Sequence, residues 1–302
     1  MSSLSLVFFG TGQTSLDALI ALSNEFTIES VITKPDTKTS SGKVQPTLVA
    51  QWAHDNSVPY YKPKDKAELS TLVAQKKFSS PVGVVLDYGI IIPEDVIDYF
   101  EYEIINSHFS LLPQYRGADP IRAAILGGDK TTGVTIMQIV PELDAGAILS
   151  WNEYTIPPSI TEPDLRVALS EINCAILPET LKLYLAQELT PIAQDVSAIT
   201  HSKKVKKENG LLDPSETAVN LERQVRAYIT WPKSYIVAQN TQIVITQALV
   251  SSEKMPQGKL SVSNKKLYFG CKNGSLEIFE LQPASKKSMD AQGFINGYKN
   301  LL

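Results

Sequence analysis

Short apolar runs alternate with helical patterns over residues 1–188, and this alternation most constrains the fold. The first run, residues 5–9, ends in Gly10-Thr11-Gly12, which suits a tight turn between a strand and a helix. A later run, residues 81–87, is nearly continuous in apolar residues, as expected of a buried parallel strand. Strands and helices in this order form an open sheet with helices on both faces. The pattern therefore predicts a doubly wound α/β domain over residues 1–188.

The pattern changes after residue 188. Residues 189–207 lose the helical period and end in Lys203-Lys204-Val205-Lys206-Lys207, which indicates a linker with a basic end. Residues 208–302 contain one helical pattern and then several short strand-like runs, and Asn273-Gly274 is a strong hairpin signal between the last two. Short strands at this spacing predict a smaller β-barrel domain.

Composition narrows the classes of function. The net charge of -4 means that any contact with nucleic acid must come from a local basic patch. Cys174 and Cys271 lie in apolar patterns far apart in the chain, so we expect two buried free thiols, as in a reducing compartment. Three histidines and two cysteines lack the spacing of metal ligands. We therefore expect no metal. No run of about 18 apolar residues occurs, so we expect a cytoplasmic protein with no membrane contact.

Polar side chains follow a short apolar run within residues 104–120. Ile104 and Ile105 precede Asn106 and His108, which are two residues apart and project to the same side of an extended backbone. Ligands of α/β proteins bind at the carboxyl ends of strands, so this segment is a candidate site. A lone histidine at a strand end is more often a satisfied polar residue, and asparagine is a common turn former.

The motif Asn106-x-His108-x-Ser110-Leu111-Leu112-Pro113-x-x-Arg116-Gly117 resembles the active-site segment of the 10-formyltetrahydrofolate-dependent formyltransferases. The resemblance covers nearly the full chain. It implies a Rossmann-like formyltransferase domain followed by an OB-like tRNA-binding barrel. Further matching segments are Phe9-Gly10-Thr11, Thr33-Lys34-Pro35-Asp36, Tyr88-Gly89, Gly133-Val134-Thr135-Ile136-Met137-Gln138, Leu143-Asp144-Ala145-Gly146 and Trp231-Pro232.

The run from Leu281 to Met289 resembles the branch of this family that formylates the α-amino group of methionyl-tRNA. For that branch the resemblance implies 10-formyltetrahydrofolate as co-substrate, initiator methionyl-tRNA as acceptor, a role in translation initiation and a monomeric state. The chain departs from the family pattern at four positions. The family usually has proline at Gly12, a small residue at Asp87, glycine or proline at Phe109 and an acidic residue at Ala147.

The resemblance also assigns roles to individual residues. Asn106, His108 and Asp144 match the catalytic trio. The folate-contacting positions are Ser110, Leu111, Leu112, Pro113, Tyr88 and Gly89. Lys34, Lys38 and Lys43 lie in the loop where the family has an arm that reaches the tRNA. The basic run of the linker also suits a phosphate backbone, and its lysines are Lys203, Lys204, Lys206 and Lys207. Both lysine groups are also compatible with a solvated surface, although a flexible basic arm can follow a phosphate backbone.

The trio has the chemistry that formyl transfer needs. An amine attacks a formyl carbon, an oxyanion develops, and the amine must lose a proton. The amide of Asn106 and the imidazole of His108 are suitable oxyanion donors. The carboxylate of Asp144 can fix the tautomer of the imidazole and accept a proton.

Other functions remain open at this point. UDP-amino-sugar formyltransferases share the trio, and Leu-Leu-Pro-x-Tyr-Arg-Gly resembles some of them. The basic run at residues 203–207 and the run from Leu281 to Met289 favour tRNA over a sugar acceptor. A third possible enzymatic reaction is the hydrolysis of formyltetrahydrofolate. A non-enzymatic alternative is a tRNA-binding protein without catalysis, and the intact trio argues against it.

Overall fold

The computed structural model describes residues 4–38, 44–76 and 78–302. The chain forms two compact units, and each is described by itself. Unit 1 comprises residues 1–117, 132–154 and 166–201, and unit 2 comprises residues 118–131, 155–165 and 202–302.

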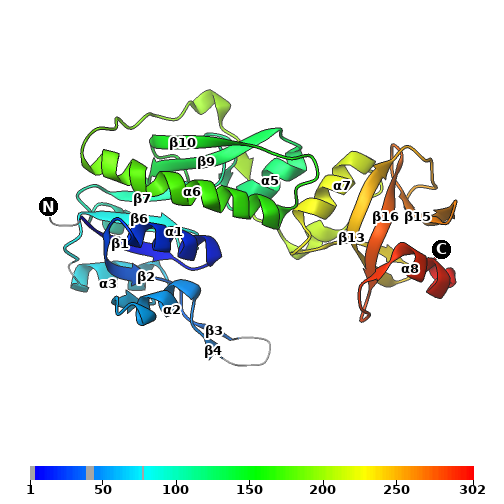
Figure 1. Cartoon of the computed structure of the whole chain (residues 1–302), viewed down its shortest axis with the longest axis horizontal. Coiled ribbons are helices and arrows are strands. Elements are labelled where there is room, and N and C mark those ends of the chain that lie inside the picture. Colours follow the sequence, from blue (N-terminus) through cyan, green and yellow to red (C-terminus); the bar gives the residue numbers. More distant parts are fainter. Residues whose placement is uncertain (1–3, 39–43, 77) are drawn as a thin grey trace. The chain divides into compact units, whose positions relative to one another are not determined.

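Unit 1 is built on a seven-stranded sheet with the strand order β10-β9-β7-β6-β1-β2-β5 (Figure 1). The pairs from β7 through β5 are parallel, and β9 is antiparallel to β7. The chain builds outward from β1 first toward β5 and then toward β10, which confirms the predicted doubly wound α/β fold. The strands are β1 (Ser5–Gly10), β2 (Thr27–Ile32), β5 (Tyr60–Tyr61), β6 (Val82–Leu86), β7 (Ile104–His108), β9 (Thr131–Gln138) and β10 (Ile148–Thr155).

Helices cover both faces of this sheet because alternate residues of its strands point in opposite directions. Val7 and Phe9 of β1 belong to one buried cluster with Val73 of α3 and Val96 of α4. Helix α1 contacts β1, β2 and β6. Burial of each large apolar side chain contributes about 1.5–3 kcal/mol. The helices are α1 (Gln13–Ser23), α2 (Leu48–Asp55), α3 (Lys66–Lys76), α4 (Glu94–Ile97) and the long α6 (Glu162–Leu185).

The remaining short elements lie in loops or, for η3, near the C-terminus. Strands β3 and β4 pair antiparallel in the loop where the sequence analysis places tRNA-contacting lysines. Lys38 has its backbone in β3, and Lys43 lies outside the described residues. These elements are β3 (Thr37–Lys38), β4 (Val44–Gln45), β8 (Arg116–Gly117), η1 (Val196–Ala198), β11 (His201–Ser202), η2 (Lys207–Gly210) and η3 (Lys299–Leu301).

Unit 2 contains an antiparallel sheet with the order β12-β13-β16-β15-β14, and β17 pairs with β16. Leu221 and Val225 of α7 share a helix face and pack in the core of this sheet with Phe294 of α8. This β-rich unit confirms the predicted OB-like domain. Its elements are α5 (Pro120–Gly127), α7 (Ala218–Ala227), β12 (Ser234–Ala238), β13 (Thr241–Ser251), β14 (Leu260–Ser263), β15 (Lys266–Gly270), β16 (Ser275–Pro283), β17 (Met289–Asp290) and α8 (Ala291–Gly297).

The two cysteines differ in their burial. Both cysteines are free thiols, but only Cys271 is buried, whereas Cys174 is half-buried. The prediction of burial is therefore wrong for Cys174, which lies in the middle of α6. In the described part of the chain, no helix has both the length and the apolar character that a membrane span requires.

Candidate active site

Strand β7 carries two of the three predicted catalytic residues. Asn106 and His108 occupy alternate positions of this strand and so share one side of it. The backbone register places Asn106 opposite Val85 of β6 and Met137 of β9. His108 is 6% exposed and Asn106 is half-buried. The carboxyl end of a parallel strand therefore presents both side chains at the edge where α/β proteins bind ligands.

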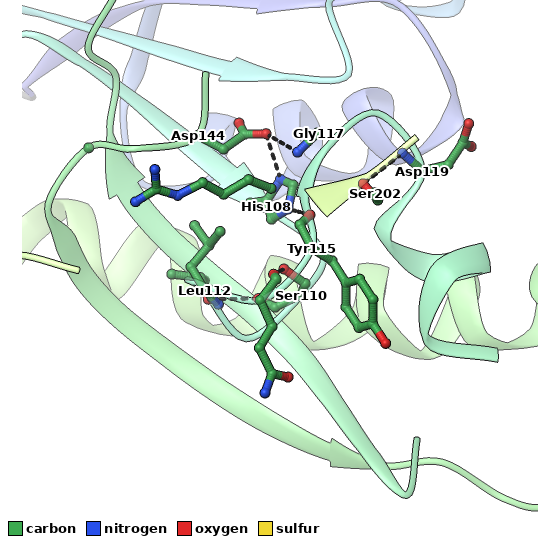
Figure 2. Close-up of polar contacts among 12 residues, drawn as sticks. His108, Ser110, Leu112, Tyr115, Gly117, Asp119, Asp144 and Ser202 are labelled. Carbon is green, nitrogen blue, oxygen red and sulfur yellow. Dashed lines mark hydrogen bonds and ion pairs between the residues drawn. The ribbon is translucent and has the colours of Figure 1, made fainter. Parts of the chain in front are cut away.

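The imidazole of His108 lies between a backbone carbonyl and a carboxylate (Figure 2). Its Nε2 lies 2.9 Å from the carbonyl oxygen of Tyr115. A carbonyl only accepts, so Nε2 carries a proton and donates it. Its Nδ1 lies 3.7 Å from Oδ2 of Asp144, which is beyond hydrogen-bond distance. The ring is thus oriented by Tyr115 and keeps Nδ1 beside the carboxylate without a short bond to it.

Asp144 lies in the turn after β9 and is held in an uncommon backbone conformation. Its φ is +52°, in the left-handed region that aspartate tolerates better than most residues. Its Oδ2 accepts a hydrogen bond of 2.7 Å from the N–H of Gly117 (Figure 2). A Cβ on Gly146 would lie 1.7 Å from the carbonyl oxygen of Gln138, so this position requires glycine. Steric and hydrogen-bond constraints together fix the carboxylate near His108.

The turn from Ser110 to Pro113 is tied to β9 through one threonine. The hydroxyl of Thr135 donates to the carbonyl of Ser110 over 2.7 Å and accepts from the N–H of Leu112 over 3.1 Å. The hydroxyl of Ser110 donates to the carbonyl of Gln114 over 2.6 Å. These bonds give the predicted folate-contacting turn a defined shape directly after His108.

The second predicted folate segment, Tyr88 and Gly89, follows β6. The Tyr88 ring is 2% exposed and packs edge-on against Phe9, and burial raises the pKa of its phenol well above the usual range. Gly89 has a φ of +74°, and a Cβ there would lie 2.2 Å from Nζ of Lys34. The amine of Lys34 therefore lies against this loop, and the backbone of Tyr88 and Gly89 is what the loop can offer a ligand.

Two of the departures from the family pattern meet in space. A Cβ on Gly12 would lie 2.9 Å from Oδ2 of Asp87. Gly12 follows β1 and Asp87 follows β6, the two strands between which the strand order reverses. Glycine at position 12 thus leaves room for the carboxylate at the switch point of the sheet, where ligands of this fold class bind.

The linker lysines lie on a backbone that is anchored within unit 2. The Asp119 N–H donates to the hydroxyl of Ser202 over 3.3 Å (Figure 2), and Oδ2 of Asp119 accepts from the Val205 N–H over 3.1 Å. Ser202 and Val205 are buried. The exposed side chains of this run are Lys203, Lys204, Lys206 and Lys207. The anchored backbone presents these four cations to solvent.

Sequence reasoning missed two residues that support the site, Gln194 and Thr200. The Thr200 hydroxyl accepts from the Tyr115 N–H over 2.8 Å, and its carbonyl accepts from the Arg116 N–H over 2.9 Å. Gln194 bonds to the turn that carries Asp144. Both lie in the stretch interpreted as a linker, and no local pattern distinguishes them because their partners are 48 or more residues away in sequence.

Comparisons with known proteins identify the family of this chain. The sequence model of a family described as "Formyl transferase" matches residues 5–181, and that of "Formyl transferase, C-terminal domain" matches residues 204–299. The chain is 35% identical to the methionyl-tRNA formyltransferase of Methylococcus capsulatus, over 97% of this chain and 96% of that protein. It is 34% identical to the methionyl-tRNA formyltransferase of Hydrogenovibrio crunogenus, over 96% of this chain and 95% of that protein.

Solved structures share the fold at lower identity. An N-formyltransferase from Helicobacter canadensis, in complex with folinic acid and dTDP-3-aminofucose, has a TM-score of 0.70 at 18% identity and covers 91% of this chain and 98% of its own. HypX from Aquifex aeolicus, in complex with tetrahydrofolic acid, has a TM-score of 0.62 at 14% identity and covers 98% of this chain and 47% of its own. The sequence relatives, which match over nearly their whole length, identify the branch: the chain belongs to the methionyl-tRNA formyltransferase family.

Proposed function

We propose that this enzyme transfers the formyl group of 10-formyltetrahydrofolate to the α-amino group of initiator methionyl-tRNA for translation initiation. The observation that carries the proposal is the pairing of His108 with Asp144 at the carboxyl edge of a formyltransferase sheet, 3.7 Å apart. Family membership supports a tetrahydrofolate-type formyl donor. The exposed lysines of the anchored linker support a tRNA acceptor.

The proposed reaction proceeds by direct attack of the amine. The α-amino nitrogen adds to the formyl carbon, and a tetrahedral intermediate with a negative oxygen forms. The Asn106 amide donates to this oxygen, and so does His108 through a proton on Nδ1, since its Nε2 is engaged by the carbonyl of Tyr115. One such donor contributes about 3–4 kcal/mol. Asp144 accepts the proton that the amine loses. The negative oxygen then re-forms the carbonyl as the bond from the carbon to N10 of the folate breaks. N10 takes up the proton that Asp144 accepted, and tetrahydrofolate leaves.

The folate would lie along two segments of defined backbone. The turn formed by Ser110, Leu111, Leu112 and Pro113 is held by Thr135 next to His108. The loop at Tyr88 and Gly89 offers its backbone, because the ring of Tyr88 is buried against Phe9. Backbone donors and acceptors at such a strand edge suit the polar groups of a pterin.

We assign the catalytic domain to residues 1–188, the linker to residues 189–207 and the tRNA-binding domain to residues 208–302. The lysines proposed to contact tRNA are Lys34 and Lys38 in the first domain and Lys203, Lys204, Lys206 and Lys207 in the linker. We further propose a monomer in the cytoplasm, in keeping with the two free thiols.

The function is tested by offering several acceptors to the purified enzyme with 10-formyltetrahydrofolate. Initiator methionyl-tRNA and a UDP-amino sugar are supplied in parallel, and free formate is measured with neither present. The expected product is formylmethionyl-tRNA alone. Formylation of the sugar alone would contradict the tRNA acceptor and indicate a sugar formyltransferase. Free formate alone would indicate a hydrolase. No turnover with any acceptor would indicate a tRNA-binding protein without catalysis.

Neutralising the linker lysines is expected to weaken tRNA binding and reduce its salt dependence. Each lost phosphate contact lowers the slope of log K against log salt by about 0.7–0.9, so four contacts correspond to about 3. The variant replaces Lys203, Lys204, Lys206 and Lys207 with glutamine, and binding is measured from low to moderate salt. A control variant, Lys64→Gln with Lys66→Gln on exposed positions near α3, should keep the wild-type slope. A wild-type slope in the linker variant would remove these lysines from the tRNA interface.

A further inference from the structure

We propose that Gln194 is a positioning residue that sets the place of the Asp144 carboxylate. Gln194 follows α6 and is 9% exposed. Its Nε2 donates to the carbonyl oxygens of Asp144 and Gly146, each over 2.8 Å. Its Oε1 accepts from Nε of Arg116 over 3.0 Å. The amide therefore uses both of its N–H groups and its oxygen in one buried site.

The orientation of this amide is fixed by chemistry. The two carbonyls only accept and the guanidinium only donates, so a flipped amide would face like partners on every side. The carbonyls belong to the residues on either side of Ala145, so one side chain spans the turn. Asp144 has a left-handed φ of +52°, and such a conformation persists only where surrounding structure holds it. Gln194, in the segment after α6, stabilises this conformation through its two hydrogen bonds to the turn.

Arg116 connects the same amide to the loop that orients His108. Arg116 stands between Tyr115, whose carbonyl accepts from His108, and Gly117, whose N–H donates to Asp144. Its Nη1 also lies 3.1 Å from Oε1 of Glu142, in the same turn as Asp144. Gln194 thus joins two segments, one that orients the imidazole and one that carries the carboxylate. Loss of its donors should let the two segments separate.

The proposal rests on the proposed function, because it concerns the position of the group that accepts the amine proton. Gln194→Glu is the sharpest variant. It keeps the side-chain length and an acceptor for Arg116, but it replaces the donor to both carbonyls with a second acceptor. Gln194→Ala removes the whole contact. Gln292→Ala, at an exposed glutamine of α8, is the matched control.

The kinetic test compares kcat and KM of these variants with methionyl-tRNA as acceptor. A misplacement of about 1 Å costs about 100-fold in rate, so Gln194→Glu and Gln194→Ala should lower kcat by about 10- to 100-fold. KM for either substrate should change less than threefold, because a displaced Asp144 affects the transition state rather than substrate binding. In an Asp144→Asn background, Gln194→Glu should add less than a twofold loss. Retention of half the wild-type kcat, or losses that multiply with Asp144→Asn, would overturn the proposal.

A second readout does not depend on the reaction. The Gly117 amide donates to Asp144, so Gln194→Glu should raise its hydrogen-exchange rate at least tenfold while amides of β13 keep theirs. Unchanged exchange at Gly117 would overturn the proposal even if activity fell. If the wild-type enzyme formylates another acceptor, the proposed function fails, and the same kcat comparison and the exchange measurement still decide the role of Gln194.

Discussion

His108→Ala is expected to lower kcat for formyl transfer to methionyl-tRNA by about 100- to 1000-fold, the loss typical for removal of one oxyanion donor. The imidazole is buried, its Nε2 is engaged by the carbonyl of Tyr115, and its Nδ1 lies beside Asp144. Its removal takes away the proposed donor to the developing oxyanion and the ring that packs beside the Asp144 carboxylate. The rate is measured in a single turnover with saturating 10-formyltetrahydrofolate.

The matched control is His54→Ala. His54 lies on α2 with a side chain that is 71% exposed, and its ion-pair partner is its neighbour Asp55. Exposed pairs of this kind contribute little, so the control should keep wild-type rate and thermal stability. A His108→Ala enzyme with half or more of the wild-type rate would contradict the catalytic role of His108.

Gly146→Ala is expected to have the second largest effect. The added methyl would lie 1.7 Å from the carbonyl oxygen of Gln138, and backbone atoms cannot move aside as a flexible side chain can. The turn must therefore shift, and Asp144 two residues earlier shifts with it. We expect a loss of kcat of about 100-fold, in line with the effect of a 1 Å displacement at a reacting group. The midpoint of thermal unfolding should fall as well.

The control for this substitution is Gly297→Ala at the end of α8, where a Cβ meets nothing within 4 Å. This enzyme should have wild-type kcat and an unchanged or slightly higher unfolding midpoint. A Gly146→Ala enzyme as active as Gly297→Ala would show that the Asp144 turn tolerates displacement and would weaken the proposed role of its geometry.

The strands of unit 1 could be predicted because their signal is local. Residues 5–9 and 81–87 are continuous apolar runs, and the structure has β1 at Ser5–Gly10 and β6 at Val82–Leu86. The common side of Asn106 and His108 follows from strand periodicity alone. The proximity of His108 to Asp144 does not, since these residues are far apart in sequence. The family resemblance predicts this proximity, and the backbone constraints at Gly117 and Gly146 explain how the fold achieves it.

Other features depend on contacts that no local pattern reveals. The sequence pattern does not predict helix α8, because this short segment contains Gly293 and Gly297, which lower helix propensity. Its stability comes from the N-cap Asp290, which accepts from the Gly293 N–H over 2.7 Å, and from the buried ring of Phe294. Gln194 likewise gains its role only when the chain is folded, because its partners lie on other segments.

The most direct test of the central claim is a double-mutant cycle between His108 and Asp144, read as single-turnover formyl transfer to initiator methionyl-tRNA. Asp144→Asn keeps an oxygen for the Gly117 N–H and tolerates the left-handed φ, so it removes the charge with little change in shape. If the pair acts as one unit, the single-turnover rate of the double variant should lie within about threefold of the rate of the slower single variant. Losses that multiply, or a wild-type enzyme that leaves methionyl-tRNA unformylated, would contradict the account.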